Sequence, residues 1–127
     1  MSRYVIDSWA WIEYLVGSEP GRKAKDIIEN EDILTSIVTV AEITSKLARA
    51  GKDVGSVFSS IASLSKIIVG NPEFAKGVGI LHSQVKKKIP NFSLGDAFVL
   101  HTAKTLNAKV LTGDSDFKTI KGAVMLK

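Results

Sequence analysis

The sequence predicts an α/β fold: a doubly wound parallel sheet with helices on both of its faces. Short apolar segments with strand character alternate along the chain with longer segments whose apolar residues recur at helical spacing. This alternation is typical of right-handed βαβ crossovers, which place successive strands parallel in one sheet. With 127 residues, 45% of them hydrophobic, the chain has the size and the apolar content of one compact domain. We therefore assign residues 1–127 to a single domain.

Local patterns define each element in turn. Strands are predicted where apolar or β-branched residues run together, and helices where apolar residues recur every three or four positions. The predicted strands are residues 3–6, 33–36, 67–69, 109–111 and 122–126. The predicted helices are residues 8–16, 22–29, 39–50, 54–65, 72 to about 88, and 96–106. Segments 17–21 and 90–95, which contain glycine and proline, are predicted as loops.

Two of the predicted helices have characteristic residues at their ends. Thr39 and Glu42 have the spacing of a capping box, and Gly51 supplies a stop after the same helix. Ser93 and Asp96 have the same capping-box spacing before the last helix. These residues fix where the two helices are expected to begin.

Acidic residues stand at the points where predicted strands end or predicted helices begin. In chain order they are Asp7 after the first strand, Glu42 and Asp96 at two helix starts, and Asp114 and Asp116 after the fourth strand. The carboxyl ends of parallel strands share one edge of the sheet, where ligands bind. We therefore expect Asp7, Glu42 and Asp114 to converge there. The sequence alone does not fix the place of Asp96.

Each acid also has an ordinary structural interpretation. Asp7 and Asp114 can be N-caps, whereas Glu42 and Asp96 can close capping boxes and Asp116 can be a turn residue. This interpretation is weaker when the acids are considered together than when each is considered alone. Carboxylates that share a pocket repel one another and raise one another's pKa values unless a cation lies among them.

The composition limits which cation could lie there. The chain has no cysteine, and its two histidines, His82 and His101, fall within predicted helices. Carboxylate oxygens in an open site favour magnesium or manganese over zinc or copper. Two such ions about 3.5 to 4 Å apart can generate hydroxide and neutralise the attacking and leaving oxygens of a phosphodiester. The acids therefore suggest metal-dependent phosphodiester hydrolysis.

The charge of the chain suits a polyanionic substrate. The net charge is +4, and setting aside Asp7, Glu42, Asp96 and Asp114 removes four negative charges and leaves +8 on the remainder. The candidate phosphate-binding residues are Lys46, Arg49, Lys86, Lys87 and Lys88. A solvated helix face or a helix C-terminus is the structural alternative for each of them.

The remaining composition concerns location and packing. The start of the chain shows neither a signal-peptide core nor about 20 consecutive apolar residues that could span a membrane. Together with the absence of cysteine, this leads us to expect a cytoplasmic protein without a membrane anchor. Trp9, Trp11 and Tyr14 fall on the first predicted helix, where core packing or a dimer seam is favoured over base stacking.

Three segments also occur in an order and spacing that one family shares. They are VIDSWAWIEYL from Val5, TVAEITSKL from Thr39 and SLGDAFVLHTAKTLNAKVLTGDSDF from Ser93. Together they resemble the PIN-domain ribonucleases, in particular the VapC toxins of type II toxin–antitoxin systems. The last segment, an Asp-opened helix followed by a strand and a T-x-D-x-D-F loop, is the most specific of the three.

The resemblance implies a five-stranded parallel sheet whose acidic pocket binds Mg²⁺ or Mn²⁺ and hydrolyses single-stranded RNA. The family's site residues correspond here to Asp7, Glu42, Asp96, Asp114, a less regular Asp116, and the flanking hydroxyls of Ser8 and Thr112. Trp9 is bulkier than the small polar residue often found at its position, which implies a narrower pocket mouth. Family members of this length usually form homodimers and are silenced by a small antitoxin. RNA, an antitoxin and a second copy of the chain are therefore the expected partners.

Other interpretations of strand-end acids fit the sequence less well. A phosphoacceptor receiver domain needs an acidic neighbour beside Asp7 and an acid after the third strand, where Gly70 and Asn71 stand. A phosphatase of the Asp-x-Asp type needs an acid in the place of Trp9. Two alternatives stay open: a PIN domain of RNA processing or decay, and a catalytically silent PIN-like scaffold that binds RNA or protein. The lack of a zinc ribbon favours the toxin, and the complete acid set disfavours the scaffold.

Overall fold

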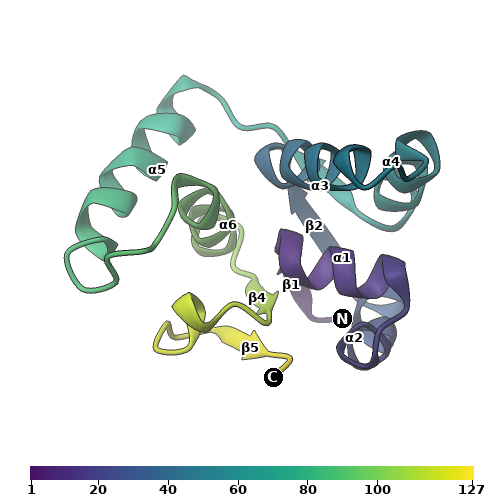
Figure 1. Cartoon of the computed structure of the whole chain (residues 1–127). Coiled ribbons are helices and arrows are strands. Elements are labelled where there is room, and N and C mark those ends of the chain that lie inside the picture. The colour runs from purple at the N-terminus through teal and green to yellow at the C-terminus, as the bar shows by residue number, and fades with distance from the viewer.

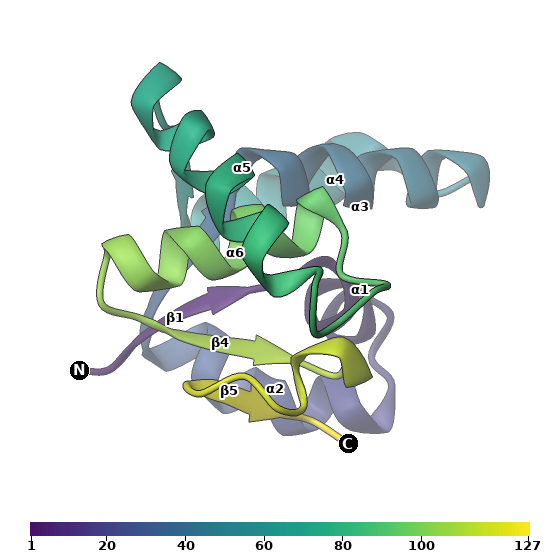
Figure 2. The same cartoon turned by 90° about the vertical axis from the view of Figure 1, so that its left-hand side faces the viewer.

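A five-stranded parallel sheet runs through the centre of the computed structural model, which describes residues 1–127. Its strands are β1 (Arg3–Ile6), β2 (Asp32–Ser36), β3 (Lys66–Ile68), β4 (Lys109–Thr112) and β5 (Ala123–Met125). They lie in the order β3-β2-β1-β4-β5, and each neighbouring pair is parallel. Figure 2 shows β1, β4 and β5 pointing the same way, with the chain's N-terminus at the opposite edge from its C-terminus. The predicted parallel α/β sheet is confirmed.

Helices cover both faces of this sheet (Figure 1). They are α1 (Ser8–Val16), α2 (Glu19–Asn30), α3 (Ile37–Arg49), α4 (Val54–Leu64), α5 (Pro72–Val85) and α6 (Leu94–Thr105), with a short 3-10 helix η1 (Ser115–Phe117) after β4. One core cluster joins the sheet to α1, α2, α3 and α4, and a second joins it to α5 and α6. The chain therefore changes face after β3, and the fold is doubly wound.

Alternation along the central strands builds these two cores. On β1, Val5 belongs to the cluster under α5 and α6, whereas Ile6 belongs to the cluster under α1 to α4. Val110 and Leu111 on β4 divide in the same way, because successive side chains of a strand point to opposite faces. All four side chains are at most 1% exposed. Both faces of β1 and β4 are buried, so only the strand ends can present polar groups to a ligand.

Three predicted helix starts are wrong, those of α2, α3 and α6. Helix α2 begins at Glu19 because Ser18 caps it and accepts a hydrogen bond from the N–H of Gly21, with Pro20 in the first turn, so the predicted loop is shorter. Helix α3 begins at Ile37, capped by Ser36, and not at Thr39. The predicted capping box of Thr39 with Glu42 therefore does not form. Thr39 is instead fully buried, and its hydroxyl has no hydrogen-bond partner.

The helix that carries Asp96 starts where its capping box places it. Ser93 accepts a hydrogen bond from the N–H of Asp96 at 3.0 Å, and the Asp96 carboxylate accepts one from the N–H of Ser93 at 3.0 Å. Asp96 is thus the third residue of α6 and does not open it. Helix α5 ends at Val85, three residues before the predicted end, and the chain turns toward Pro90. None of the helices has both the length and the apolar character needed to cross a bilayer.

Candidate functional site

The five predicted acids gather at the carboxyl edge of the sheet. Asp7 follows β1, Asp114 follows β4, Asp116 lies in η1, Asp96 lies in the first turn of α6, and Glu42 lies in the second turn of α3. The tightest group is Asp96, Asp114 and Asp116, whose carboxylates each offer an oxygen within 4.8 Å of the others. Asp7 and Glu42 stand beside this group and are coupled to it electrostatically. The structure thus places Asp96 in this group as well, a position that the sequence alone did not fix.

Asp7 is the most deeply buried acid of the set, with 4% of its surface exposed. One carboxylate oxygen accepts a hydrogen bond from the N–H of Ala10 at 2.8 Å, so Asp7 also caps α1. The other accepts a hydrogen bond from the Thr112 hydroxyl. Burial raises the pKa of Asp7 to about 7. The two hydrogen bonds oppose this rise in pKa, and the negative charges of Asp114 and Asp96 add to it.

Thr112 joins two acids at the end of β4. Its buried hydroxyl donates to Asp7 and accepts a hydrogen bond from the N–H of Asp114 at 2.9 Å. Asp114 in turn accepts a hydrogen bond from the N–H of Asp116 at 2.9 Å and caps η1. The loop after β4 is therefore held with its acids next to Asp7. Ser8, the other predicted hydroxyl residue, is the first residue of α1 and lines the groove described below.

Glu42 reaches the group through a close contact between α3 and α6. It is exposed as a whole residue, yet a Cβ placed on Gly95 would overlap its carboxylate. Partial burial of the carboxyl group raises the pKa of Glu42, and the charge of Asp96 raises it further. Burial also raises the pKa of Asp96, against the effect of its Ser93 hydrogen bonds, and Asp114 and Asp116 add to the rise.

No basic side chain neutralises these acids. The two ion pairs of the structure join Arg3 to Asp32 and Lys76 to Glu73, and neither includes an acid of the site. Like charges that stay together without a counter-ion favour the binding of a cation. The donor set consists of carboxylate oxygens alone, which suits Mg²⁺ or Mn²⁺. The residues present therefore fit a divalent metal site.

A groove of about 400 Å³ leads away from the acids between α1 and α3. It is lined by Ser8, Trp9, Ile12, Glu42, Lys46, Arg49 and Asp114. Lys46 and Arg49 follow Glu42 on α3 by one and two turns, so the structure brings these two predicted phosphate-binding residues to the site. Trp9 was expected to pack in the core or at a dimer seam. It is half-buried, packs against the core cluster under α1 to α4, and also forms a wall of the groove.

The three consecutive lysines do not line this groove. Lys86, Lys87 and Lys88 lie in the turn after α5, on the side of the sheet opposite α3 (Figure 1). The Lys86 ammonium donates a hydrogen bond to the carbonyl of Pro90 at 2.7 Å and so closes this turn. A structural role is thereby present for Lys86.

Two glycines at the site were not singled out from the sequence. Gly95 makes room for the Glu42 carboxylate, and a Cβ at Gly113 would overlap the Trp9 ring. Each glycine directly precedes an acid, Asp96 or Asp114. The repeated Gly-Asp pair is the sequence pattern that could have identified them, because glycine is favoured where another group approaches the backbone closely.

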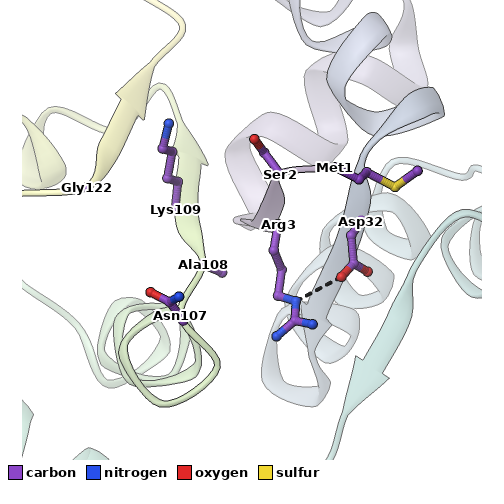
Figure 3. A pocket seen from close by; sticks show the side chains of 8 residues that line it. All are labelled: Met1, Ser2, Arg3, Asp32, Asn107, Ala108, Lys109 and Gly122. Atoms are coloured by element: carbon purple, nitrogen blue, oxygen red, sulfur yellow. Dashed lines mark hydrogen bonds and ion pairs between the residues drawn. The ribbon is translucent and has the colours of Figure 1, made fainter.

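The largest cavity of the molecule lies at the other edge of the sheet. It has a volume of about 630 Å³ and is lined from Met1 to Arg3, by Asp32, by Asn107 to Lys109 and by Gly122 (Figure 3). Its one acid is paired, because Arg3 Nε lies 2.8 Å from Asp32. This cavity therefore lacks the group of unpaired acids found at the groove, and its remaining charged side chain, Lys109, is basic.

Comparison with known proteins decides the family. The family model described as PIN domain matches residues 4–123. The chain belongs to the PIN-domain family. Membership of this family of nucleases supports nuclease activity, and the acids at the strand ends lie where such activity needs them.

Solved structures with the same fold come from toxin–antitoxin systems. A toxin–antitoxin complex from Klebsiella pneumoniae matches with a TM-score of 0.79 and 20% identity, covering 98% of both chains. VapBC2 from Rickettsia felis, bound to a DNA fragment from its promoter, matches with a TM-score of 0.70 and 17% identity over 97% of this PIN domain and 96% of that chain. VapC20 from Mycobacterium tuberculosis, described as a toxin that cleaves the sarcin–ricin loop, matches with a TM-score of 0.71 and 13% identity, covering 94% and 96%. No curated protein sequence matches the chain. At these identities the structural likeness establishes the fold, and the resemblance to VapC proteins seen in the sequence extends to the whole architecture.

Proposed function

We propose that this PIN domain, spanning residues 1–127, is a divalent-metal-dependent endoribonuclease that cuts single-stranded RNA and acts as the toxin of a toxin–antitoxin pair in the cytoplasm. One observation carries the proposal: five carboxylates meet at the carboxyl edge of a PIN fold with no basic partner. The structural neighbours from toxin–antitoxin complexes support a small antitoxin as its partner. A homodimer is part of the same proposal.

The acids have distinct roles in this function. Asp96, Asp114 and Asp116 would hold the metal, with Asp7 and Glu42 completing the site. Bound Mg²⁺ or Mn²⁺ supplies activation of water and neutralisation of charge on the phosphate oxygens. Thr112 and the Ala10 N–H hold the Asp7 carboxylate in place, and Thr112 also orients the backbone before Asp114. Lys46 and Arg49 raise the local concentration of a polyanionic strand beside the acids.

Cleavage of single-stranded RNA with and without metal tests the proposal. The purified protein should cut RNA in Mg²⁺ or Mn²⁺, lose the activity in EDTA, and regain it when the metal is restored. The control is Asp26→Asn, which removes the same charge from an exposed position on α2 and should cut like the unchanged protein. Undiminished cleavage in EDTA would contradict the metal mechanism. Binding of RNA without cleavage in any metal would favour the silent scaffold.

A further inference from the structure

We infer that the groove between α1 and α3 fixes how the RNA strand lies: its phosphates follow Lys46 and Arg49, and a base next to the cleaved phosphate stacks on Trp9. This inference rests on the proposed function and adds to it a strand orientation and a base-binding residue. Helices α1 and α3 are in contact and lie side by side (Figure 1), so the two walls face one groove. Both walls meet the acids, since Glu42 and Asp114 line the same groove.

The first wall is the indole of Trp9, which lies against backbone. A Cβ at Gly113 would overlap three neighbouring ring atoms, Cζ3, Cε3 and Cη2, at nearly equal distances. Because this Cβ position lies at nearly the same distance from three adjacent ring atoms, Gly113 lies over the face of the indole and not at its edge. The ring is therefore held flat against the residue that directly precedes Asp114. A base stacked on this indole would lie beside the acid group.

The indole also contacts a cation, whose place a stacked base would take. The Lys127 ammonium lies 5.0 Å from the centroid of the Trp9 ring, a cation–π contact made by an exposed terminal residue. Trp9 is half-buried, whereas the other tryptophan, Trp11, is fully buried and donates a hydrogen bond to Thr35. Core packing thus explains Trp11 fully and Trp9 in part, because Trp9 also packs against the core cluster under α1 to α4, and the exposed remainder of Trp9 lines the groove.

The second wall is a row of cations on α3. Lys46 and Arg49 follow Glu42 at the fourth and seventh positions, which places all three on one side of the helix. Both cations are exposed, and neither belongs to an ion pair. They also lie in the last turn of α3, where basic residues stabilise the helix C-terminus, and this is the competing explanation for them.

Single-stranded RNA is the occupant that uses both walls. Proteins bind single strands by combining a cationic groove for the phosphates with aromatic rings on which bases stack. An acidic peptide would use the cations of α3 and leave the indole of Trp9 unused. A strand with its backbone along α3 has its bases directed toward α1, which gives a preference for the nucleotide at one position relative to the cut.

The test uses tryptophan fluorescence and binding of a short mixed-sequence single-stranded RNA in EDTA and low salt, so that cleavage does not interfere. RNA should quench the emission of Trp9 and leave that of buried Trp11. Trp9→Leu should abolish the quenching and weaken binding about tenfold, whereas Trp9→Phe, which retains a ring, should bind within about threefold of the unchanged protein. A melt of each variant checks that the fold is intact.

The cation wall is tested by the salt dependence of the same binding. Replacing Lys46 and Arg49 together by alanine should reduce the slope of log affinity against log salt by about two units. The matched control is Lys104→Ala, at the exposed far end of α6, which should leave the slope unchanged. An unchanged slope in the double variant would return both residues to their role at the helix end and overturn the inference.

The outcomes separate this inference from the proposed function. Suppose that the protein cleaves RNA, and that its Trp9→Leu variant binds RNA equally well, shows the same quenching by RNA and cuts at the same positions. This result overturns the strand orientation alone. RNA that quenches Trp9 without being cut in any metal supports the groove and contradicts the nuclease. A polyglutamate peptide that quenches Trp9 as strongly as RNA overturns RNA as the occupant.

Discussion

The two edges of the sheet differ in the way that matters for function. The amino edge has the larger cavity, about 630 Å³, but its Asp32 is paired with Arg3. The carboxyl edge has a groove of about 400 Å³ and five acids without a basic partner. Unpaired acidic charge, and not cavity size, therefore distinguishes the edge to which we assign the function. An acid paired with a base is stable without a ligand, whereas acids that repel one another are stabilised when a cation binds among them.

The largest effect is expected when the acids of the carboxyl edge are replaced by their amides. Asp7→Asn, Glu42→Gln, Asp96→Asn and Asp114→Asn each remove an anionic ligand. The three asparagine variants keep most of the capping ability, because asparagine caps a helix about as well as aspartate. We expect each to lower cleavage by orders of magnitude in an RNA assay. Asp32→Asn, at the amino edge, should cut at the unchanged rate. Normal cleavage by all four site variants would mean that these acids bind no catalytic metal.

The next effect concerns the pH dependence of metal-free stability. The pKa of Asp7 is about 7 in the folded protein and 3.8 in the reference state, so its protonated form favours the fold. This stabilisation is fully present below about pH 4 and is lost as the pH rises through 7, amounting to as much as about 4 kcal/mol. Asp7→Asn should lack this dependence. The measurement is the difference in unfolding free energy between the two proteins from pH 4 to 8 in EDTA. A constant difference would show that Asp7 is solvated.

Metal should stabilise the protein through the carboxyl edge. At a metal concentration one hundred times its dissociation constant, the gain is about 2.7 kcal/mol, if the metal binds only the folded state. Thermal melts with and without Mg²⁺ or Mn²⁺ measure this gain, and Asp96→Asn and Asp114→Asn should show distinctly less of it. The Asp32→Asn variant is the control and should keep the full gain. Equal gains in every variant would place the metal elsewhere.

The smallest effect belongs to the amino edge. The Arg3–Asp32 pair is about half exposed on each side, with 45% and 42% of the side-chain surface accessible. Exposed pairs of this kind contribute about 0 to 1 kcal/mol, and less as salt rises. Arg3→Ala should therefore change stability by about that amount and leave RNA cleavage unaffected. A large loss of cleavage would show that the cavity in Figure 3 takes part in function.

Sequence reasoning predicted the parts of the site that depend on strand order. Asp7 directly follows β1 and Asp114 comes two residues after the end of β4, so the parallel sheet alone brings them together. Asp96 could not be placed this way, since its position depends on how closely α6 approaches α3 at Gly95. That approach is a tertiary contact with no periodic pattern in the sequence.

The wrong start predicted for α3 has a similar cause. Thr39 has the spacing of a cap, but Ser36 at the end of β2 supplies the cap one turn earlier and Thr39 is buried inside the helix. The composition of Lys86–Lys88 suggested phosphate binding, and this stays a prediction; the structure places the run in the turn after α5, outside the lining of the groove. Trp9 packs against the core as its helical spacing predicts, but that spacing does not show that Trp9 also lines the groove.

The hydrogen bond between Thr112 and Asp7 joins residues 105 positions apart in a chain of 127. During synthesis, β1 and β2 can pair early, but the place of β4 beside β1 stays empty until residues 109–112 have left the ribosome. A growing chain thus carries Asp7 without the loop that completes the acid group. If the protein cuts RNA, the translating ribosome and its message are exposed to a complete acid group only after β4 and the loop that follows it have been made.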